Sequence, residues 1–345
     1  MREKHANIPI FIPHEGCPHT CVFCDQQAIT GSPAPKPGTV SKIIENAVET
    51  LGGRSAEIAF FGGSFTAIDR TLMIAYLEAA QPFIGRRGVR GIRLSTRPDA
   101  IDGEILAILA RYGVTTIELG IQSMDDEVLR LAGRGHTEKQ SENAMRLIAR
   151  TGAFRVVGQM MLGLPGSTRE KDLYTAKRIC ALGADAARIY PTAVLKNTPL
   201  AHLTDSGNYS PLSLEEGVER GADCLSVFLK YGVQVLRMGL CAQESCLDAV
   251  TAGCCHPAYG EMVRSRFYKR LLEKQLRRCP PPPGGLLTVF FAPGELSAVS
   301  GYRKENKKKL TETYKCAVKL REDPSLEKYR TRIEIRGNDS ALKIT

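Results

Sequence analysis

Residues 8–24 read IPIFIPHEGCPHTCVFC, a short apolar run followed closely by three cysteines. The apolar run has the length and composition of a buried strand. The same layout recurs downstream: a strand-like run ends in glycine, hydroxyl or charged residues, and amphipathic segments separate the runs. Seven runs fit this layout, and they are Ile8–Pro13, Glu57–Gly63, Ile92–Arg97, Thr115–Gln122, Phe154–Gly163, Arg188–Val194 and Val233–Gly239.

The segments between these runs have helical periodicity. Apolar residues recur at helical spacing over 40–51 and 101–109, and Thr137 with Gln140, like Ser167 with Glu170, has the spacing of a capping box. Alternating strands and helices favour a parallel sheet. We therefore expect an α/β fold, a parallel (β/α)6 partial TIM-type barrel with a small C-terminal α+β module. Its strand ends would meet at one edge, where such folds place their active sites.

Composition narrows the class of protein. The 345 residues are 43% hydrophobic and 24% charged, with no apolar run long enough for a membrane span and no secretory signal at the start. We expect a cytoplasmic protein with no membrane partner. The 47 Lys and Arg exceed the 37 Asp and Glu by 10, which favours an anionic partner. Eleven cysteines, an odd number, favour a metal over a disulfide framework.

Cys17, Cys21 and Cys24 are the most specific signal. Three thiolates in this spacing can each hold one iron of a 4Fe–4S cluster, which leaves the fourth iron open to a substrate or cofactor. A zinc site completed by His14 or His19, or three unligated thiols, are the alternatives. A second, looser group has irregular spacing and favours buried apolar roles over a second metal; it contains Cys241, Cys246, Cys254, Cys255 and His256.

Further candidates stand at the ends of the later strands. Gly62 and Gly63 let a ligand approach the backbone closely, and Ser64 and Thr66 add hydroxyl groups. Ser95 ends the next run.

Three charged or amide side chains complete this set. Arg97 can hold a carboxylate or a phosphate, or form a structural salt bridge. Glu118 can accept hydrogen bonds from a ligand, and in an apolar strand it needs a buried partner. Gln122 faces the same edge. Tyr190 and Lys196 are candidate substrate contacts.

These motifs together resemble the radical S-adenosylmethionine (radical SAM) superfamily. The resemblance implies that SAM chelates the open iron, that Gly62, Gly63 and Ser64 contact its amino group, and that Phe23 lies beside the adenine. It also implies reductive cleavage of SAM to a 5′-deoxyadenosyl radical that abstracts hydrogen from a substrate. The electron would come from a donor such as a flavodoxin or ferredoxin.

The later motifs resemble the catalytic subunit of Elongator over about residues 8–240. They are Glu118–Ser123, Arg134–Thr137, Met160–Ser167 and Arg188–Thr192. This resemblance implies modification of tRNA uridine, hence an RNA partner. The chain differs in carrying Gln159-Met160-Met161-Leu162 where that family has His-Met-Met-Pro. No acetyl-CoA loop is recognisable after the last strand, so the resemblance does not extend to that family's acetyltransferase domain or imply the use of acetyl-CoA.

Domain boundaries are expected at two places. Residues 1–250 would form the partial barrel, 251–285 a helix and a proline-rich linker, and 286–345 a basic module. From Gly301 on, the chain contains 13 Lys and Arg and 7 Asp and Glu, a net charge of +6. This module resembles a KH-type RNA-binding fold with a degenerate loop, Gly301-Tyr302-Arg303-Lys304; a basic structural cap is the alternative. A small-molecule substrate, or a non-catalytic zinc-containing RNA-binding protein, are the alternative functions.

Overall fold

The computed structural model describes residues 5–13, 16–17, 21–25, 33–240, 248–337 and 341–344. The chain forms two compact units. The N-terminal unit comprises Met1–Gly217 and Val227–Cys255, and the C-terminal unit comprises Val218–Ser226 and His256–Thr345. One helix, α9 (Leu214–Lys230), contributes residues to both units.

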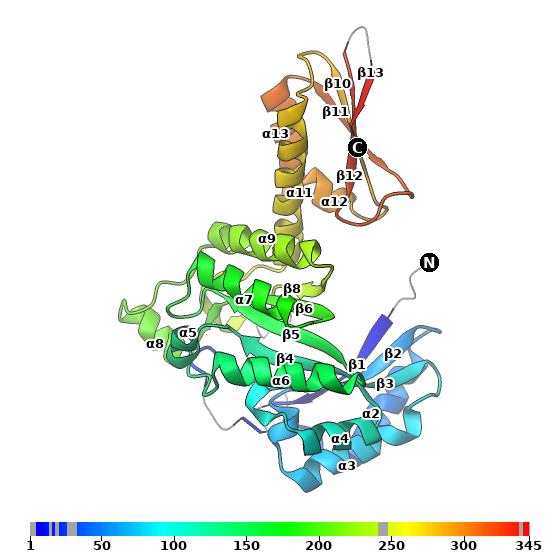
Figure 1. Ribbon diagram of the computed structural model, residues 1–345, viewed down its shortest axis with the longest axis vertical. Helices are drawn as coiled ribbons and strands as arrows, with labels where there is room; N and C mark the ends of the chain where they lie inside the picture. The colour runs from blue at the N-terminus through cyan, green and yellow to red at the C-terminus, as the bar shows by residue number, and fades with distance from the viewer. Residues whose placement is uncertain are drawn as a thin grey trace. The chain divides into compact units, whose positions relative to one another are not determined.

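A sheet of seven parallel strands forms the centre of the N-terminal unit (Figure 1). Its strands lie side by side in chain order, and six crossovers join them, which confirms the predicted parallel partial barrel. All seven predicted runs contain a strand. The strands are β1 (His5–Ile12), β2 (Ser55–Gly62), β3 (Val89–Thr96), β4 (Val114–Gln122), β5 (Arg155–Leu162), β6 (Ala186–Pro191) and β8 (Gln234–Met238).

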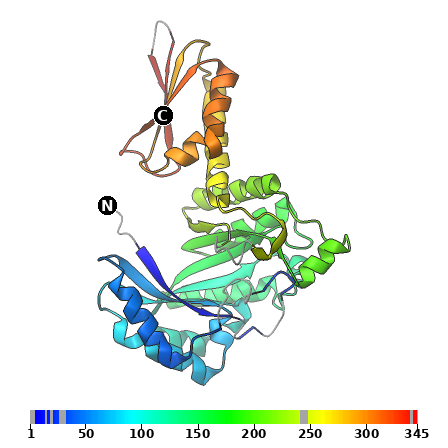
Figure 2. The same ribbon diagram turned by 180° about the vertical axis from the view of Figure 1, so that it is seen from behind.

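The longer crossover helices lie along the outer side of this sheet, and the short ones lie near the carboxyl ends of its strands (Figures 1 and 2). Alternate residues of β1, Ile8, Ile10 and Ile12, are at most 2% exposed because they face these helices. Burying each such side chain contributes about 1.5–3 kcal/mol. The helices are α2 (Pro37–Glu49), α3 (Arg70–Ala80), α4 (Gly103–Arg111), α5 (Asp126–Leu131), α6 (Glu138–Thr151), α7 (Arg169–Ala181) and α8 (Pro199–Asp205), with a small antiparallel pair, β7 (Ala193–Leu195) and β9 (Val250–Gly253).

The two predicted capping boxes have different outcomes. At α6, Thr137 accepts from the Gln140 backbone N–H while the Gln140 side chain accepts from the Thr137 N–H, as predicted. At α7 the prediction was wrong, because Thr168 and not Ser167 is the N-cap. The Ser167 hydroxyl instead donates to Asp172, 2.6 Å away, inside the first turn.

Strand geometry determines which side chains face the inside of the half-barrel. Successive side chains of a strand point to opposite faces. In β4, Ile117, Leu119 and Ile121 are fully buried on one face, and Glu118 and Gln122 belong to the other. The sheet register shifts between Gly120 and Gln122, the last residues of that strand.

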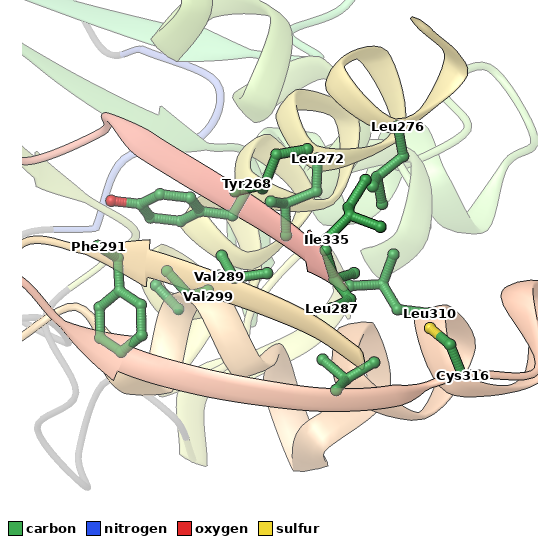
Figure 3. Close-up of a cluster of buried hydrophobic side chains, with 13 residues drawn as sticks. Tyr268, Leu272, Leu276, Leu287, Val289, Phe291, Val299, Leu310, Cys316 and Ile335 are labelled. Atoms are coloured by element: carbon green, nitrogen blue, oxygen red, sulfur yellow. The ribbon is translucent and has the colours of Figure 1, made fainter. Parts of the chain in front are cut away.

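The C-terminal unit has a four-stranded sheet with its own apolar core (Figure 3). Tyr268, Leu272 and Leu276 of one long helix pack on residues of the sheet, such as Val289. Strand β10 pairs in parallel with β11 and antiparallel with β12. The elements are α11 (Tyr259–Arg278), β10 (Leu286–Phe291), α12 (Leu296–Ser300), a 3-10 turn (Tyr302–Lys304), α13 (Glu305–Tyr314), β11 (Ala317–Glu322), β12 (Thr331–Arg336) and β13 (Ala341–Ile344).

A membrane-spanning helix needs about 20 consecutive, predominantly apolar residues. Within the part of the chain that the structure describes, no helix is both long and apolar enough to cross a bilayer.

Candidate functional site

A pocket of about 200 Å³ lies at the carboxyl ends of strands β1 to β5. Six separate chain segments contribute to it, and five of them follow or belong to a strand, as the strand-end rule for parallel α/β folds predicts. Most of the residues selected from the sequence line it. The lining residues are Cys17, Cys21, Phe23, Cys24, Gly62, Gly63, Ser64, Ser95, Thr96, Arg97, Gly120, Gln122, Arg134 and Gln159.

Two main-chain hydrogen bonds hold the described segment with Cys21 and Cys24 against the rest of the unit. Val22 N–H donates to the Ala132 carbonyl at 3.1 Å, and the Val22 carbonyl accepts from Leu200 N–H at 2.9 Å. Gly16 precedes the loop with a φ of +70°, and a Cβ there would lie 2.3 Å from the Ser64 carbonyl oxygen. Only glycine fits this position.

The Cys24 thiol is protonated in the absence of a cation. Burial, and then the neighbouring Cys21 and Cys17, raise the pKa of Cys24 to about 12. A thiolate at this position therefore needs a bound cation such as iron. Among the described residues, no three His, Cys, Asp or Glu side chains are grouped closely enough to hold one metal ion. His14 and His19, the proposed zinc ligands, lie outside the described residues.

The glycine loop after β2 lies directly beside β1. Gly63 N–H donates to the Ile12 carbonyl at 2.7 Å. Gly62 has a φ of +114°, and a Cβ there would lie 2.7 Å from the same carbonyl oxygen. The Cys17 thiol lies 3.8 Å from the Ser64 hydroxyl, so the cysteine loop and the glycine loop are in contact.

Arg97 and Gln122 each bring an unpaired polar atom to the pocket. Arg97 forms a bidentate ion pair with Asp99, at 3.0 and 3.1 Å, and donates to the Arg134 carbonyl. Its Nη1 is buried and, like Gln122 Oε1, has no hydrogen-bond partner among the described residues. Gln122 also has a left-handed φ of 65°. Buried unpaired polar atoms and backbone strain both indicate a binding site.

Thr66 does not line this pocket. It is buried, its hydroxyl lies 2.6 Å from that of Thr96, and it donates to the Ala100 carbonyl at 2.6 Å. These contacts hold the 3-10 turn after β2 against the turn after β3.

Glu118 likewise lies beneath the pocket and not in its wall. It is fully buried, and its carboxylate oxygens lie 2.7 Å from Arg93 Nη1 and 2.7 Å from Arg188 Nε. Gln159 Nε2 donates to it at 2.9 Å. Glu118 therefore orients Gln159, which does line the pocket.

The buried ion pairs continue to Glu57. Arg93 lies 2.7 Å from the Glu57 carboxylate, and Thr115 and Thr116 donate to it at 2.6 and 2.7 Å. Burial alone would raise the pKa of Glu57, but Arg93 and the two hydroxyl groups lower it below the ordinary value.

Four residues of the pocket wall belong to segments that the sequence analysis named but were not chosen as site residues: Thr96, Gly120, Arg134 and Gln159. Three of them belong to strands, where the strand-end rule could have found them. Arg134 lies between helices α5 and α6, and its neighbours Gly133 and Gly135 have φ values of 65° and 69°. A charged residue between two glycines after a short helix was the available signal.

His136 is a further buried group next to this wall. Burial, followed by the charge of Arg134, lowers its pKa to about 3. The imidazole is therefore neutral at physiological pH.

A second pocket of about 170 Å³ shares Phe23, Cys24 and Gln122 with the first. Its remaining walls are apolar apart from the hydroxyl of Tyr190. Lys196 is exposed and does not line it. The other lining residues are Met161, Tyr190, Pro191, Ala193, Leu195 and Leu240.

The looser cysteine group is only partly described. Cys241 and Cys246 lie outside the described residues. Cys254 is fully buried, and burial raises the pKa of its thiol to about 12, which fits an apolar role.

Comparison with known proteins identifies the family. Residues 11–179 match the model of the radical SAM superfamily, and residues 184–269 match the radical SAM C-terminal domain. The chain belongs to the radical SAM superfamily. Members of this superfamily use a 4Fe–4S cluster and SAM, and these are its cofactors.

Several known proteins are similar to this chain in sequence. The chain is 28% identical over 245 residues to an uncharacterized protein, MJ0486, of Methanocaldococcus jannaschii, covering 67% of this chain and 74% of that one. It is 26% identical over 319 residues to a tRNA uridine(34) acetyltransferase of the same organism, covering 79% and 58%. Human Elongator complex protein 3 is 35% identical over 140 residues, which are 40% of this chain and 25% of that protein.

A solved structure confirms the fold. The archaeal Elp3 of Methanocaldococcus infernus, with an N-terminal deletion, superposes with a TM-score of 0.62 at 23% identity, covering 82% of this chain and 67% of that chain. The chain thus spans 58% of the length of the tRNA uridine(34) acetyltransferase and a quarter of the length of human Elongator complex protein 3.

Proposed function

We propose that this chain is a radical SAM enzyme that holds its 4Fe–4S cluster on Cys17, Cys21 and Cys24 and modifies RNA, at a uridine of tRNA. One observation carries the enzyme assignment: a single pocket brings together three thiols, a glycine loop and two unpaired polar atoms. A structural metal site needs neither the open space nor the unpaired polar atoms, Arg97 Nη1 and Gln122 Oε1.

The residues of the pocket have separate roles in this proposal. When bound, the cluster and SAM supply one-electron cleavage of SAM and hydrogen abstraction from the substrate. Gly62 and Gly63 leave room beside the backbone for the methionyl group of SAM. The free Nη1 of Arg97 donates a charge-assisted hydrogen bond to a carboxylate, and Gln122 accepts one from an N–H.

The second pocket fits the reacting part of the substrate. It opens beside Cys24 and Gln122, so a group within it lies next to the cofactor pocket. Its apolar walls, such as Met161 and Leu195, favour an uncharged group and exclude water. An unsaturated base taken out of its stack is a substrate group of this kind.

The RNA assignment rests on the relatives and on charge. Two of the relatives are a tRNA uridine(34) acetyltransferase and Elongator complex protein 3. The residues from Gly301 on carry +6 of the net charge of +10. Arg303, Lys304, Lys307 and Lys308 are all exposed at the start of α13, and Gly301 before them has a φ of +87°. We place the enzyme in the cytoplasm, with a flavodoxin or ferredoxin as electron donor.

Comparing modified nucleosides from tRNA of wild-type and gene-deleted cells tests the substrate assignment. We expect one modified uridine to disappear from the deleted strain and to return with the wild-type gene, but not with a Cys21→Ala gene. Identical nucleoside profiles would contradict the tRNA assignment and leave a small-molecule substrate as the better one.

RNA binding by the C-terminal unit has its own test. With about five phosphate contacts, the logarithm of the binding constant for single-stranded RNA should fall against the logarithm of salt concentration with a slope of about −3 to −4. Changing Arg303, Lys304, Lys307 and Lys308 together to Ala should weaken binding to all tRNAs alike. The matched control removes four exposed charges of the N-terminal unit: Lys36, Lys42, Arg86 and Arg87. Equal affinities of both variants would favour the structural-cap alternative.

A further inference from the structure

Arg134 is a buried cation with no role in the site as described so far. It is 7% exposed, in the short connection between α5 and α6. No Asp or Glu among the described residues forms an ion pair with it, and its guanidinium donates hydrogen bonds to a sulfur and a carbonyl oxygen. A buried guanidinium without an anionic partner is costly, so an anion is expected beside it.

The geometry fixes where that anion lies. Arg134 Nη1 donates to Cys21 Sγ at 3.2 Å, and Nη2 donates to the Gly120 carbonyl at 2.6 Å. The main-chain carbonyl of Arg134 accepts from Arg97 Nη2. The guanidinium is thus held at one of its ends by β4, while the other end is directed at the sulfur of a proposed cluster ligand.

We propose that Arg134 is a positioning residue that raises the reduction potential of the cluster through an N–H···S hydrogen bond to Cys21. The inference rests on the proposed function, because it requires that Cys21 ligates iron. One electron enters the cluster from a one-electron donor, and the negative charge at the site increases. A fixed positive charge and a donor to the sulfur stabilise the reduced form more than the oxidised form.

Arg97 and Arg134 thereby have different tasks although both line one pocket. Arg97 has a free Nη1 for a ligand, and its other nitrogens contact Asp99 and the Arg134 carbonyl. Arg134 has both terminal nitrogens engaged, and only its Nε has no partner. A direct bond from Arg134 to SAM would use Nε or the second N–H of a terminal nitrogen, and this is the competing role that the test must separate.

The test is an EPR-monitored redox titration of the reconstituted protein without SAM. Arg134→Met keeps the bulk of the side chain but removes its charge and donors, and Arg134→Lys keeps only the charge. Arg130→Met removes an exposed arginine of neighbouring α5 and is the matched control.

We expect Arg134→Met to retain iron and to lower the equilibrium constant for cluster reduction about tenfold, which is 59 mV for one electron. Arg134→Lys should shift the midpoint less, and Arg130→Met not at all. If Arg134→Met loses its iron, the test uses Arg134→Lys instead, and a lower midpoint potential in that variant supports the proposal. Unshifted midpoints in the iron-loaded variants would overturn the inference.

Two further measurements, SAM affinity and cluster content, separate this inference from its alternatives. The dissociation constant of SAM should change less than about twofold in Arg134→Met, whereas a large loss of SAM affinity with an unshifted midpoint would make Arg134 a SAM ligand and overturn the proposal. If the wild-type protein binds no cluster, the proposed function fails as well. If it binds the cluster and cleaves SAM while the midpoints of the variants do not shift, only the role of Arg134 fails.

Discussion

Two polar layers inside the same half-barrel use the same residue types in opposite ways. In the ion-pair layer, which contains Glu57, Arg93, Glu118 and Arg188, every charged group has an opposite charge within 3 Å. In the pocket layer, which contains Arg97, Gln122 and Arg134, each side chain retains a buried polar atom without a partner among the described residues. One atom of the ion-pair layer, Arg188 Nε, also makes no hydrogen bond, but it lies 2.7 Å from a Glu118 oxygen, so the charges of that layer are compensated. A charge-compensated network stabilises the fold, whereas the uncompensated polar atoms of the pocket layer indicate a missing ligand.

The difference explains why residue type alone does not identify a site. Arg93 and Arg97 are four residues apart and both are 3% exposed; Arg93 lies within β3 and Arg97 directly follows it. Arg93 bridges two carboxylates, and Arg97 has one carboxylate and one free nitrogen. The neighbours supplied by other strands decide which of the two can bind a ligand.

The largest expected effect is that of a substitution at Gly63, which tests whether the pocket layer binds a ligand. Gly63→Val should fill the space beside the backbone that the methionyl group of SAM needs, so SAM binding and cleavage should be lost while the cluster remains. Equilibrium binding of SAM and iron content measure the two separately. Gly38→Val, at an open position in the first turn of α2, is the control. Normal SAM affinity in Gly63→Val would remove the glycine loop from the cofactor site.

The second effect is on stability. Glu118→Ala leaves Arg93 and Arg188 buried without their shared partner, so the free energy of unfolding should fall by about 3–5 kcal/mol. Gln122→Asn, in the pocket layer, should cost far less, because Gln122 Oε1 has no partner to lose and Asn tolerates a left-handed φ. Denaturant unfolding of both variants measures this. Equal losses would show that the two layers do not differ as described.

The smallest effect is a pH dependence at His136. Its folded-state pKa of about 3 lies below the unfolded value of 6.5, so the unfolded chain binds the proton first and stability is lost as pH falls below 6.5. Between pH 7.5 and 5.5 this loss should be about 1 kcal/mol.

His136→Gln should remove that pH dependence. Unfolding free energies of the wild type and the variant at both pH values provide the comparison, and parallel pH profiles would contradict the neutral buried imidazole.

Local patterns in the sequence predicted most of the fold and the core of the site. The strands of the large sheet were predictable because apolar runs and the breaks after them are local features. The cysteine spacing and the Gly62-Gly63 pair were predictable for the same reason. The cap of α7 was placed one residue early, since Ser167 and Thr168 are both good caps and only the turn geometry separates them.

Long-range partners could not be predicted in this way. Arg134 reaches Cys21 across 113 residues, and Glu118 reaches Arg188 across 70. No spacing rule connects such residues. The sequence correctly required a buried partner for Glu118, but the partner's identity depends on the register of β3, β4 and β6.

The central claim is that the three thiols hold a cluster at which SAM is cleaved, and anaerobic reconstitution tests it most directly. Iron, sulfide and 5′-deoxyadenosine are measured with a strong reductant in the wild type, in the triple Ala variant of Cys17, Cys21 and Cys24, and in Cys180→Ala, which changes a cysteine on α7. We predict about four irons per chain and release of 5′-deoxyadenosine for the wild type and Cys180→Ala, and neither for the folded triple variant. Full iron content in the triple variant, or a reduced and fully loaded wild type that binds no SAM, would contradict the claim.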